Sequence, residues 1–314
     1  MPKFFKTYDE QIDHLKNKKR LSILNEDAAK SVLADIGYFT LIGGYKYPFK
    51  DPTTKLYRKD VTFDDIVLLY HFDEDLRRLF LRYLLNVERK IKARIAYVFC
   101  EIHGELQQTY LDPKNYDDNN GNPLQIAGIS KLISMLNDLA TKPTGYPYIN
   151  HHQITYGNVP LWVLINAITF GSTSKMHGFL PQPLQSKISR DYPLTISQLK
   201  EMLTVLTKYR NACAHNERLY SYTTKDTIPD LLLHKKLHIP QKKGHYICGK
   251  HDLFSVVIAL RYLLPRSDYK AFKLDLSRTI DKFTKKCTAF SKADLLKSMG
   301  FPTNWKNITR YKLQ

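Results

Sequence analysis

The chain has 314 residues, of which 43% are hydrophobic and 25% are charged. These values exclude an intrinsically disordered chain, a collagen-like repeat and a coiled coil. The 48 Lys and Arg residues outnumber the 30 Asp and Glu residues, which gives a formal net charge of +18. So basic a protein typically binds a polyanion, either nucleic acid or an acidic membrane surface. A general basic bias of the host's proteins is the alternative.

The cysteines and the apolar segments indicate the compartment. Four cysteines without a Cys-x-x-Cys pair are too sparse for a secreted disulfide scaffold and favour a reducing environment. The chain start turns polar after two phenylalanines, unlike a signal peptide. The longest apolar stretch, 161–170, is interrupted by Asn166 and is about half the length of a membrane span. We therefore predict a cytoplasmic protein without a membrane partner; its cysteines are Cys100, Cys213, Cys248 and Cys287.

Residues 1–60 predict an N-terminal helical extension with an aromatic loop. Helices are expected over 8–17 and 26–36, the second with Asn25 as its N-cap. The segment 38–49 is rich in aromatic residues and contains glycines and a proline, which predicts an irregular loop packed by its own aromatic rings. The polar stretch 50–59 predicts a surface loop.

The strongest helical pattern runs over 63–102. Its apolar residues recur at spacings of three and four, which is one face of a 3.6-residue repeat. We expect either one helix or two helices with a break near Phe72–Asp73. In the second case Asp73, Glu74 and Asp75 mark a helix N-terminus and its dipole partners; they are not interpreted as paired catalytic acids. The apolar face comprises Phe80, Leu84, Val87, Ile91, Ile95 and Val98.

The rest of the chain also favours helices. Residues 112–123 predict a loop, 221–251 a basic irregular insertion, and Thr195 with Gln198 a capping box. Few segments resemble strands, and the predicted class is therefore all-α. One compact unit is expected, with a helical core over 61–290 and a tail helix within 291–314. Its further helices are expected over 126–139, from Pro160 onward, 195–209, 252–264, 269–286 and from Ser291 to about Gly300.

Arg210 is the most informative residue of the helix over 195–209. It continues the apolar stripe of Leu199, Leu203 and Leu206, since residues 199 and 210 are about three turns apart. An arginine on such a stripe needs a partner, a cavity or an interface, because an unpaired buried charge is costly. His215 is rotated by about 140° from Arg210 on a continuing helix. The two side chains can meet only if the helix ends there or a second subunit supplies the partner. Alternatively, Arg210 pairs with a core carboxylate and His215 is a core histidine.

The stretch YRNACAHNERLY, residues 209–220, resembles the Arg–polar–x-x-x-His signature of HEPN ribonucleases. It is most similar to the form found in the abortive-infection (Abi) family of AbiD/AbiF type. Five further segments resemble that family in the same order: KTYDEQIDHLKNK, IGYFTLIGGYKYPF, FDEDLRRLFLRYLLNVERKIKARIA, YGNVPLWVLINAITFGSTSKM and MGFPTNW.

This resemblance implies a HEPN-like helical bundle and a homodimer in which two copies of the motif form one composite site. Members of the family are phage-resistance or toxin-like proteins, and the HEPN domains of type VI CRISPR effectors cleave RNA without a metal. The resemblance therefore implies a metal-independent endoribonuclease that uses no cofactor.

The residue types of the motif suit this chemistry. Cleavage through the 2′-hydroxyl needs a group that moves protons and a cation that stabilises the charged phosphorane. Histidine as a residue type suits the first role, which is assigned to His215, and Arg210 can bind phosphate with two donors. Asn211 is assigned to orient the phosphate or the histidine. The expected products end in a 2′,3′-cyclic phosphate or a 3′-phosphate.

Neighbouring residues are assigned supporting roles. Lys208 and Tyr209 precede the motif as site support. Glu217 stands where some HEPN toxins have a tyrosine that a partner enzyme modifies, so this type of control is not supported. Glu217 and Arg218 are expected to pair within the motif, across the dimer or simply as a surface ion pair. Basic residues alternating with aromatic ones suit RNA, and the RNA-binding candidates are Lys235, Lys236, Lys242, Lys243, Lys285 and Lys286.

Other interpretations are weaker or remain open. His245, Cys248 and His251 do not match a common zinc module, and His151 and His152 are expected in a solvated loop. A regulatory noncoding RNA could neutralise the +18 charge; purification at low salt without bound RNA would count against it. The alternative functions are a non-catalytic RNA-binding scaffold on the same fold and a protein that senses a phage component.

Overall fold

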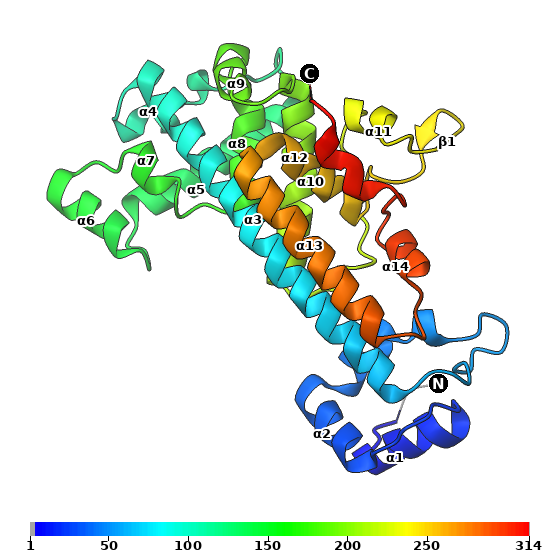
Figure 1. The fold of residues 1–314 in the computed structure, drawn as a ribbon. Helices are drawn as coiled ribbons and strands as arrows, with labels where there is room; N and C mark the ends of the chain where they lie inside the picture. The colour runs from blue at the N-terminus through cyan, green and yellow to red at the C-terminus, as the bar shows by residue number, and fades with distance from the viewer. Residues whose placement is uncertain (1–3, 314) are drawn as a thin grey trace.

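The computed structural model describes residues 4–313 and confirms the all-α class. Helices form the bundle drawn in Figure 1, and the two-stranded hairpin β1–β2 is the only sheet among these residues. No helix in this part of the chain is both long and apolar enough to cross a membrane. The α-helices are α1 (Tyr8–Asp13), α2 (Glu26–Ile36), α3 (Phe63–His103), α4 (Gln107–Leu111), α5 (Pro123–Thr141), α6 (Pro147–Tyr156), α7 (Leu161–Leu164), α8 (Phe170–Phe179), α9 (Gln182–Ser189), α10 (Ile196–Ala214), α11 (Leu232–Lys236), α12 (Leu253–Leu263), α13 (Arg266–Lys286) and α14 (Lys292–Ser298).

The 41-residue helix α3 is the axis of the fold. At about 1.5 Å per residue it is about 60 Å long, and α13 lies along much of it in Figure 1. Aromatic pairs join the two helices: Phe72 to Phe283 and Phe80 to Phe272, with ring centroids 4.7 and 5.2 Å apart. The expected alternative of a break near Phe72–Asp73 is wrong. The helix continues because Phe72 packs into the core and the Asp73 carboxylate has its own buried partners.

The N-terminal extension contains the predicted helices and more regular structure than expected. Asn25 caps α2 by accepting a hydrogen bond from the N–H of Ala28, as predicted. The segment 38–49, predicted as an irregular loop, instead contains the π-helical turn Phe39–Gly43 and the 3-10 turn Tyr47–Phe49. Its aromatic residues pack against other elements as well as each other. The ring of Tyr45 contacts Tyr70 of α3 and Tyr220, so this segment helps to position the chain after α10.

Helix α10 packs against α3, α8 and α12. The predicted Thr195–Gln198 capping box is present, and the helix extends to Ala214, five residues beyond the predicted end. The insertion 221–251 is largely irregular but also contains α11 and the hairpin of β1 (Gln241–Lys242) and β2 (His245–Tyr246). The loop predicted around His151 and His152 is wrong. His151 and His152 lie in α6, which starts at Pro147, a residue well suited to the first position of a helix.

The buried His177 of α8 provides a test of the core. Its side chain is inaccessible, and burial lowers its pKa from 6.5 to about 4, with a smaller effect of Lys200. Between pH 6.5 and 4, this histidine is protonated in the unfolded chain but not in the folded chain. The free energy of unfolding therefore falls as the pH decreases from 6.5 toward 4. This loss is expected to reach about 3 kcal/mol at 1.36 kcal/mol per pH unit.

His177→Leu is expected to reduce the loss of stability between pH 6.5 and 4. The measurement is urea unfolding at a series of pH values. His151→Leu on the surface of α6 serves as the matched control, because it removes an exposed histidine. Identical pH dependence in the His177→Leu variant and the unmodified protein would contradict the assignment.

Candidate active site at the end of helix α10

The predicted motif lies where α10 ends. Arg210 and Asn211 occupy its last turns, and His215 is the C-cap, whose N–H donates to the carbonyl of Asn211. Asn211 and His215 are exposed, so the alternative of a core histidine is wrong. His215 directly follows the last residue of α10, and its N–H still bonds the carbonyl four residues earlier, so it keeps about the helical rotation from Arg210. Within one subunit the two side chains therefore leave α10 in different directions.

Arg210 is anchored by a buried carboxylate on α3. Its Nε lies 3.2 Å from Glu88 Oε2, and its side chain remains 28% exposed. The other carboxylate oxygen of Glu88 is 2.8 Å from Lys92 Nζ. That ammonium in turn donates to the carbonyl of Ile168 at 2.6 Å. Because the anchor uses Nε, the two terminal nitrogens of the guanidinium make no hydrogen bond within residues 4–313. An arginine held in this way presents two donors to a phosphate.

The chain that follows His215 is held by Asp73. This carboxylate is fully buried and accepts hydrogen bonds from the N–H groups of Leu219 (2.9 Å) and Tyr220 (2.6 Å). It also accepts from the Tyr45 hydroxyl (2.8 Å) and pairs with Arg77 at 2.7 Å. Burial is the largest influence on the pKa of the Asp73 carboxyl and raises it, whereas Arg77 and the N–H donors act in the opposite direction. Asp73 is thus an internal anchor and does not belong to a helix N-terminus.

Glu217 and Arg218 do not pair with each other within residues 4–313. Arg218 donates through Nη1 to the carbonyl of Gly44 at 2.6 Å, and the carbonyl of Glu217 accepts from Arg77 at 3.3 Å. Their predicted ion pair within the motif is therefore wrong. Arg218 instead connects the chain after the motif to the π-helical turn of the N-terminal extension.

A family model described as Abi-like protein matches residues 31–221. This match spans more than half of the chain and includes both anchors and the whole motif. The chain belongs to the Abi-like protein family. Comparisons with curated proteins and with solved structures found no match.

In this Abi-like protein, Tyr209 is structural and does not line the site. Its side chain is fully buried, and its hydroxyl donates to the carbonyls of Tyr222 (3.0 Å) and His251 (2.9 Å). Tyr209 was predicted as site support, and in the structure it ties α10 to the insertion 221–251. Lys208 is exposed on α10.

The six predicted RNA-binding lysines are all exposed, but the fold does not bring them together. Lys235 and Lys236 end α11, and Lys242 and Lys243 lie in the β1–β2 hairpin. Lys285 and Lys286 lie at the end of α13, which is separated from α11 and the hairpin in Figure 1.

Sequence reasoning missed a group of arginines beside the motif. Arg78, Arg82 and Arg89 are exposed on α3 and lie about 80–120° around that helix from Glu88. We call them the arginine face. Arg78 is partly neutralised by Asp75 at 3.5 Å. Their spacing of four and seven residues within a predicted helix was the sequence signal for this face. For the anchor of Arg210, the signal was Glu88 four residues before Lys92.

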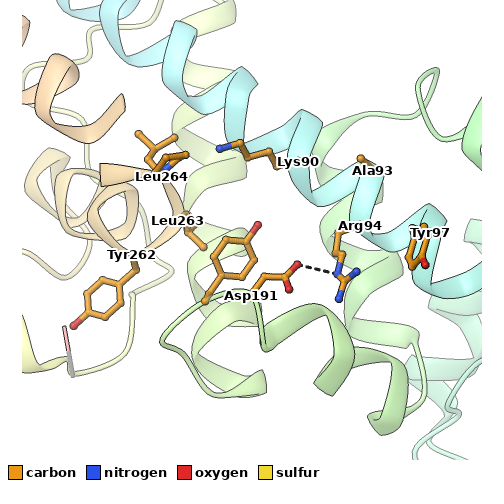
Figure 2. Close-up of a pocket in the computed structure, with 10 residues that line it drawn as sticks. Lys90, Ala93, Arg94, Tyr97, Asp191, Tyr262, Leu263 and Leu264 are labelled. Atoms are coloured by element: carbon orange, nitrogen blue, oxygen red, sulfur yellow. Dashed lines mark ion pairs between the residues drawn. The ribbon is translucent and has the colours of Figure 1, made fainter. Parts of the chain in front are cut away.

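A pocket on α3 belongs to a different surface from the motif. It has a volume of about 630 Å³ and is lined by Lys90, Arg94 and Tyr97 of α3, by residues that precede α10 and by residues at and just after the end of α12 (Figure 2). Lys90 and Arg94 are rotated by about 200–240° from Glu88. Figure 2 shows Arg94 pointing toward Asp191, and the ion pair is 2.8 Å long. No motif residue lines this pocket, and its arginine is already neutralised.

No cluster of three or more His, Cys, Asp or Glu side chains suited to a metal ion occurs among residues 4–313. His245 and His251 are exposed, and Cys248 is half-buried. The four cysteines are free thiols.

Proposed function

We propose that this Abi-like protein is a metal-independent HEPN endoribonuclease that acts in phage defence by abortive infection. The observation that carries the proposal is an exposed His215 five residues after an Arg210 whose Nε is bound by the buried Glu88. This arrangement leaves a proton-transfer group and two guanidinium donors at the surface. Cleavage through the 2′-hydroxyl requires such a proton-transfer group and such a cation.

The reaction is an internal transfer at phosphorus. The ribose 2′-hydroxyl gives its proton to a histidine and attacks the adjacent phosphorus, and the bond from phosphorus to the 5′-oxygen breaks as that oxygen receives a proton. Arg210 stabilises the charge that develops on the non-bridging oxygens. The products are a 2′,3′-cyclic phosphate and a 5′-hydroxyl.

Two proton transfers favour a site shared by two subunits. One chain contributes one His215, which can act as base or as acid in a single step but not as both. We infer that a homodimer brings a second motif to the same phosphate. The arginine face lies beside each motif and holds the strand through its phosphates, a contact that weakens with increasing salt.

The test is incubation of the purified protein with RNA in the presence of EDTA. Cleavage is expected, with products that carry a 2′,3′-cyclic phosphate. Resistance of a substrate with a 2′-deoxyribose at the cleavage site is the matched control. Binding of RNA without any cleavage would overturn the enzymatic proposal and favour the alternative, an RNA-binding scaffold.

Glu88→Gln tests the anchor of Arg210. The substitution keeps the size of the side chain but removes the charge that attracts Arg210 and Lys92, so the Arg210 guanidinium becomes less well positioned. We expect kcat to fall by about tenfold or more with little change in KM, because the contact between Arg210 and the phosphate strengthens in the transition state. Some stability is also lost, roughly 1–3 kcal/mol, since Lys92 stays buried with a weaker partner.

Glu101→Gln is the matched control for this variant. It makes the same change in the same helix, at a half-exposed ion pair with Lys187, where exposed pairs contribute little. Steady-state kinetics and urea unfolding are measured for both variants. Equal kcat values in the two variants would contradict a role for Glu88 in positioning Arg210.

A further inference from the structure

A pocket of about 600 Å³ lies at the end of the motif. Four parts of the chain line it: the turn that begins at Tyr47, Arg58, residues between Arg218 and Ser221, and the connection from α13 into α14. The volume lies in the range of pockets that hold small ligands. Arg218 follows His215 by three residues, which an extended chain spans in about 11 Å at most. The pocket is therefore a neighbour of the proposed cleavage site.

Two arginines place guanidinium groups at this pocket. Arg58 donates to the carbonyls of Pro48 and Ala289, and Arg218 donates to the carbonyl of Gly44. Carbonyl oxygens satisfy hydrogen bonds without cancelling charge, so only nearby carboxylates offset these two cations. Arg218 Nε is also buried with no hydrogen-bond partner among residues 4–313. The carboxylates nearby are Asp60, 3.5 Å from Arg58, and Asp294 in the lining.

The surroundings add cations and aromatic rings. Lys46 and Lys50 flank the Tyr47 turn in the chain, and burial lowers the pKa of Lys50, with smaller contributions from Lys46 and Lys19. Tyr47 is 65% exposed at the pocket, and Phe290 lies in its wall. Aromatic rings beside guanidinium groups are the usual means of holding an unstacked base and its phosphate.

We propose that this pocket binds one nucleotide of the single-stranded RNA substrate, next to the scissile phosphate, and sets the base preference of cleavage. The proposal rests on the proposed function for its substrate. Arg218 and Arg58 face the phosphate, and the base lies against Tyr47. The hydroxyl groups of Ser221 and Thr288 in the lining supply donors and acceptors that distinguish one base from another.

Three variants of the full-length protein test the pocket. Tyr47→Ala removes the stacking surface, Thr288→Trp fills the pocket from an exposed position, and Arg218→Gln removes one charge. Tyr156→Ala is the matched control, because this tyrosine on α6 is 63% exposed and lies outside the pocket. All four are made in a His215→Ala background so that the RNA stays intact. Binding of single-stranded A, C and U decamers and of free AMP, CMP and UMP is measured at several salt concentrations.

The expected result is weaker decamer binding. Tyr47→Ala and Thr288→Trp should each weaken it by about tenfold, the effect of losing one stacked base, and the preference among the three decamers should shrink. Arg218→Gln should reduce the slope of log K against log salt by about one. Tyr156→Ala should change neither quantity.

Three outcomes overturn the proposal. The first is decamer binding unchanged in both Tyr47→Ala and Thr288→Trp. The second is loss of free nucleotide binding in these variants while decamer binding is unaffected. That result would indicate an effector site in place of a substrate site. The third is an equal loss for Tyr156→Ala. Because binding is measured without cleavage, these results are separate from the cleavage assay. A protein that never cleaves RNA but loses decamer binding in the pocket variants refutes the proposed enzyme and keeps the nucleotide site.

Discussion

His215→Ala is expected to reduce RNA cleavage by about 10²–10⁴-fold, the usual contribution of a proton-transfer group. The free energy of unfolding should change by less than about 0.5 kcal/mol, because His215 is an exposed C-cap whose contact with α10 is made by its backbone N–H. Both quantities are measured on the purified variant, by a cleavage assay with EDTA and by urea unfolding. Arg210→Ala should cost about 10²–10³-fold in kcat, through the lost stabilisation of the phosphorane.

The control for the loss of an exposed histidine is His151→Ala on α6, a helix that projects from the bundle in Figure 1. Its cleavage rate should equal that of the unmodified protein. If His215→Ala retains full activity, the assignment of His215 fails. If it unfolds the protein, the exposed placement of the side chain is wrong. Loss of cleavage in the His151→Ala control would indicate a general effect of surface histidines.

Asp73→Ala is expected to destabilise the fold by about 3–5 kcal/mol, as removal of one partner of a buried ion pair does. The substitution leaves Arg77 as a buried charge without a carboxylate and removes the acceptor of the Leu219 and Tyr220 N–H groups. Because those groups hold the chain just beyond His215, cleavage should fall further than the fraction of folded protein does. Urea unfolding and cleavage per folded molecule give the two values.

Asp75→Ala is the matched control, since this aspartate lies two positions later in α3 with a side chain that is 41% exposed; it should cost less than about 1 kcal/mol. A double variant, Asp73→Leu with Arg77→Met, separates the two roles of Asp73. Removing both charges should recover part of the stability, whereas cleavage should stay low because the two N–H groups still lack their acceptor. Full recovery of cleavage in the double variant would contradict the role of Asp73 as an anchor of the motif.

Local patterns in the sequence were sufficient for most helices. The long apolar repeat predicted α3 to within a residue at each end, and Asn25 and Thr195 were identified as caps that the structure contains. These features depend on side chains within one or two turns, so they are visible in a short window of sequence. The Abi-like family was likewise evident from the motif and the segments around it.

Patterns that depend on distant partners were misjudged. Three consecutive acidic residues at 73–75 favoured a helix start, yet Asp73 is buried inside a continuous helix because Tyr45, Arg77 and the chain at 219–220 surround it. The polar segments that contain α6 and α11 were predicted to be irregular, because neither helix has a strong apolar face of its own. Tyr209 was predicted as site support. Its role in packing could not be foreseen, because its two carbonyl partners come from the insertion 221–251.

The sequence by itself determined the helical class, the family, and the pair of residues, Arg210 and His215, on which the proposed chemistry depends. Only the tertiary structure decided what holds them. Arg210 is bound by Glu88, 122 positions earlier, and the chain after His215 by Asp73, 146 positions before Leu219. Whether a carboxylate is buried, and which donors surround it, follows from packing between helices that are remote in sequence. No periodicity within one helix encodes which partners its buried charges will meet.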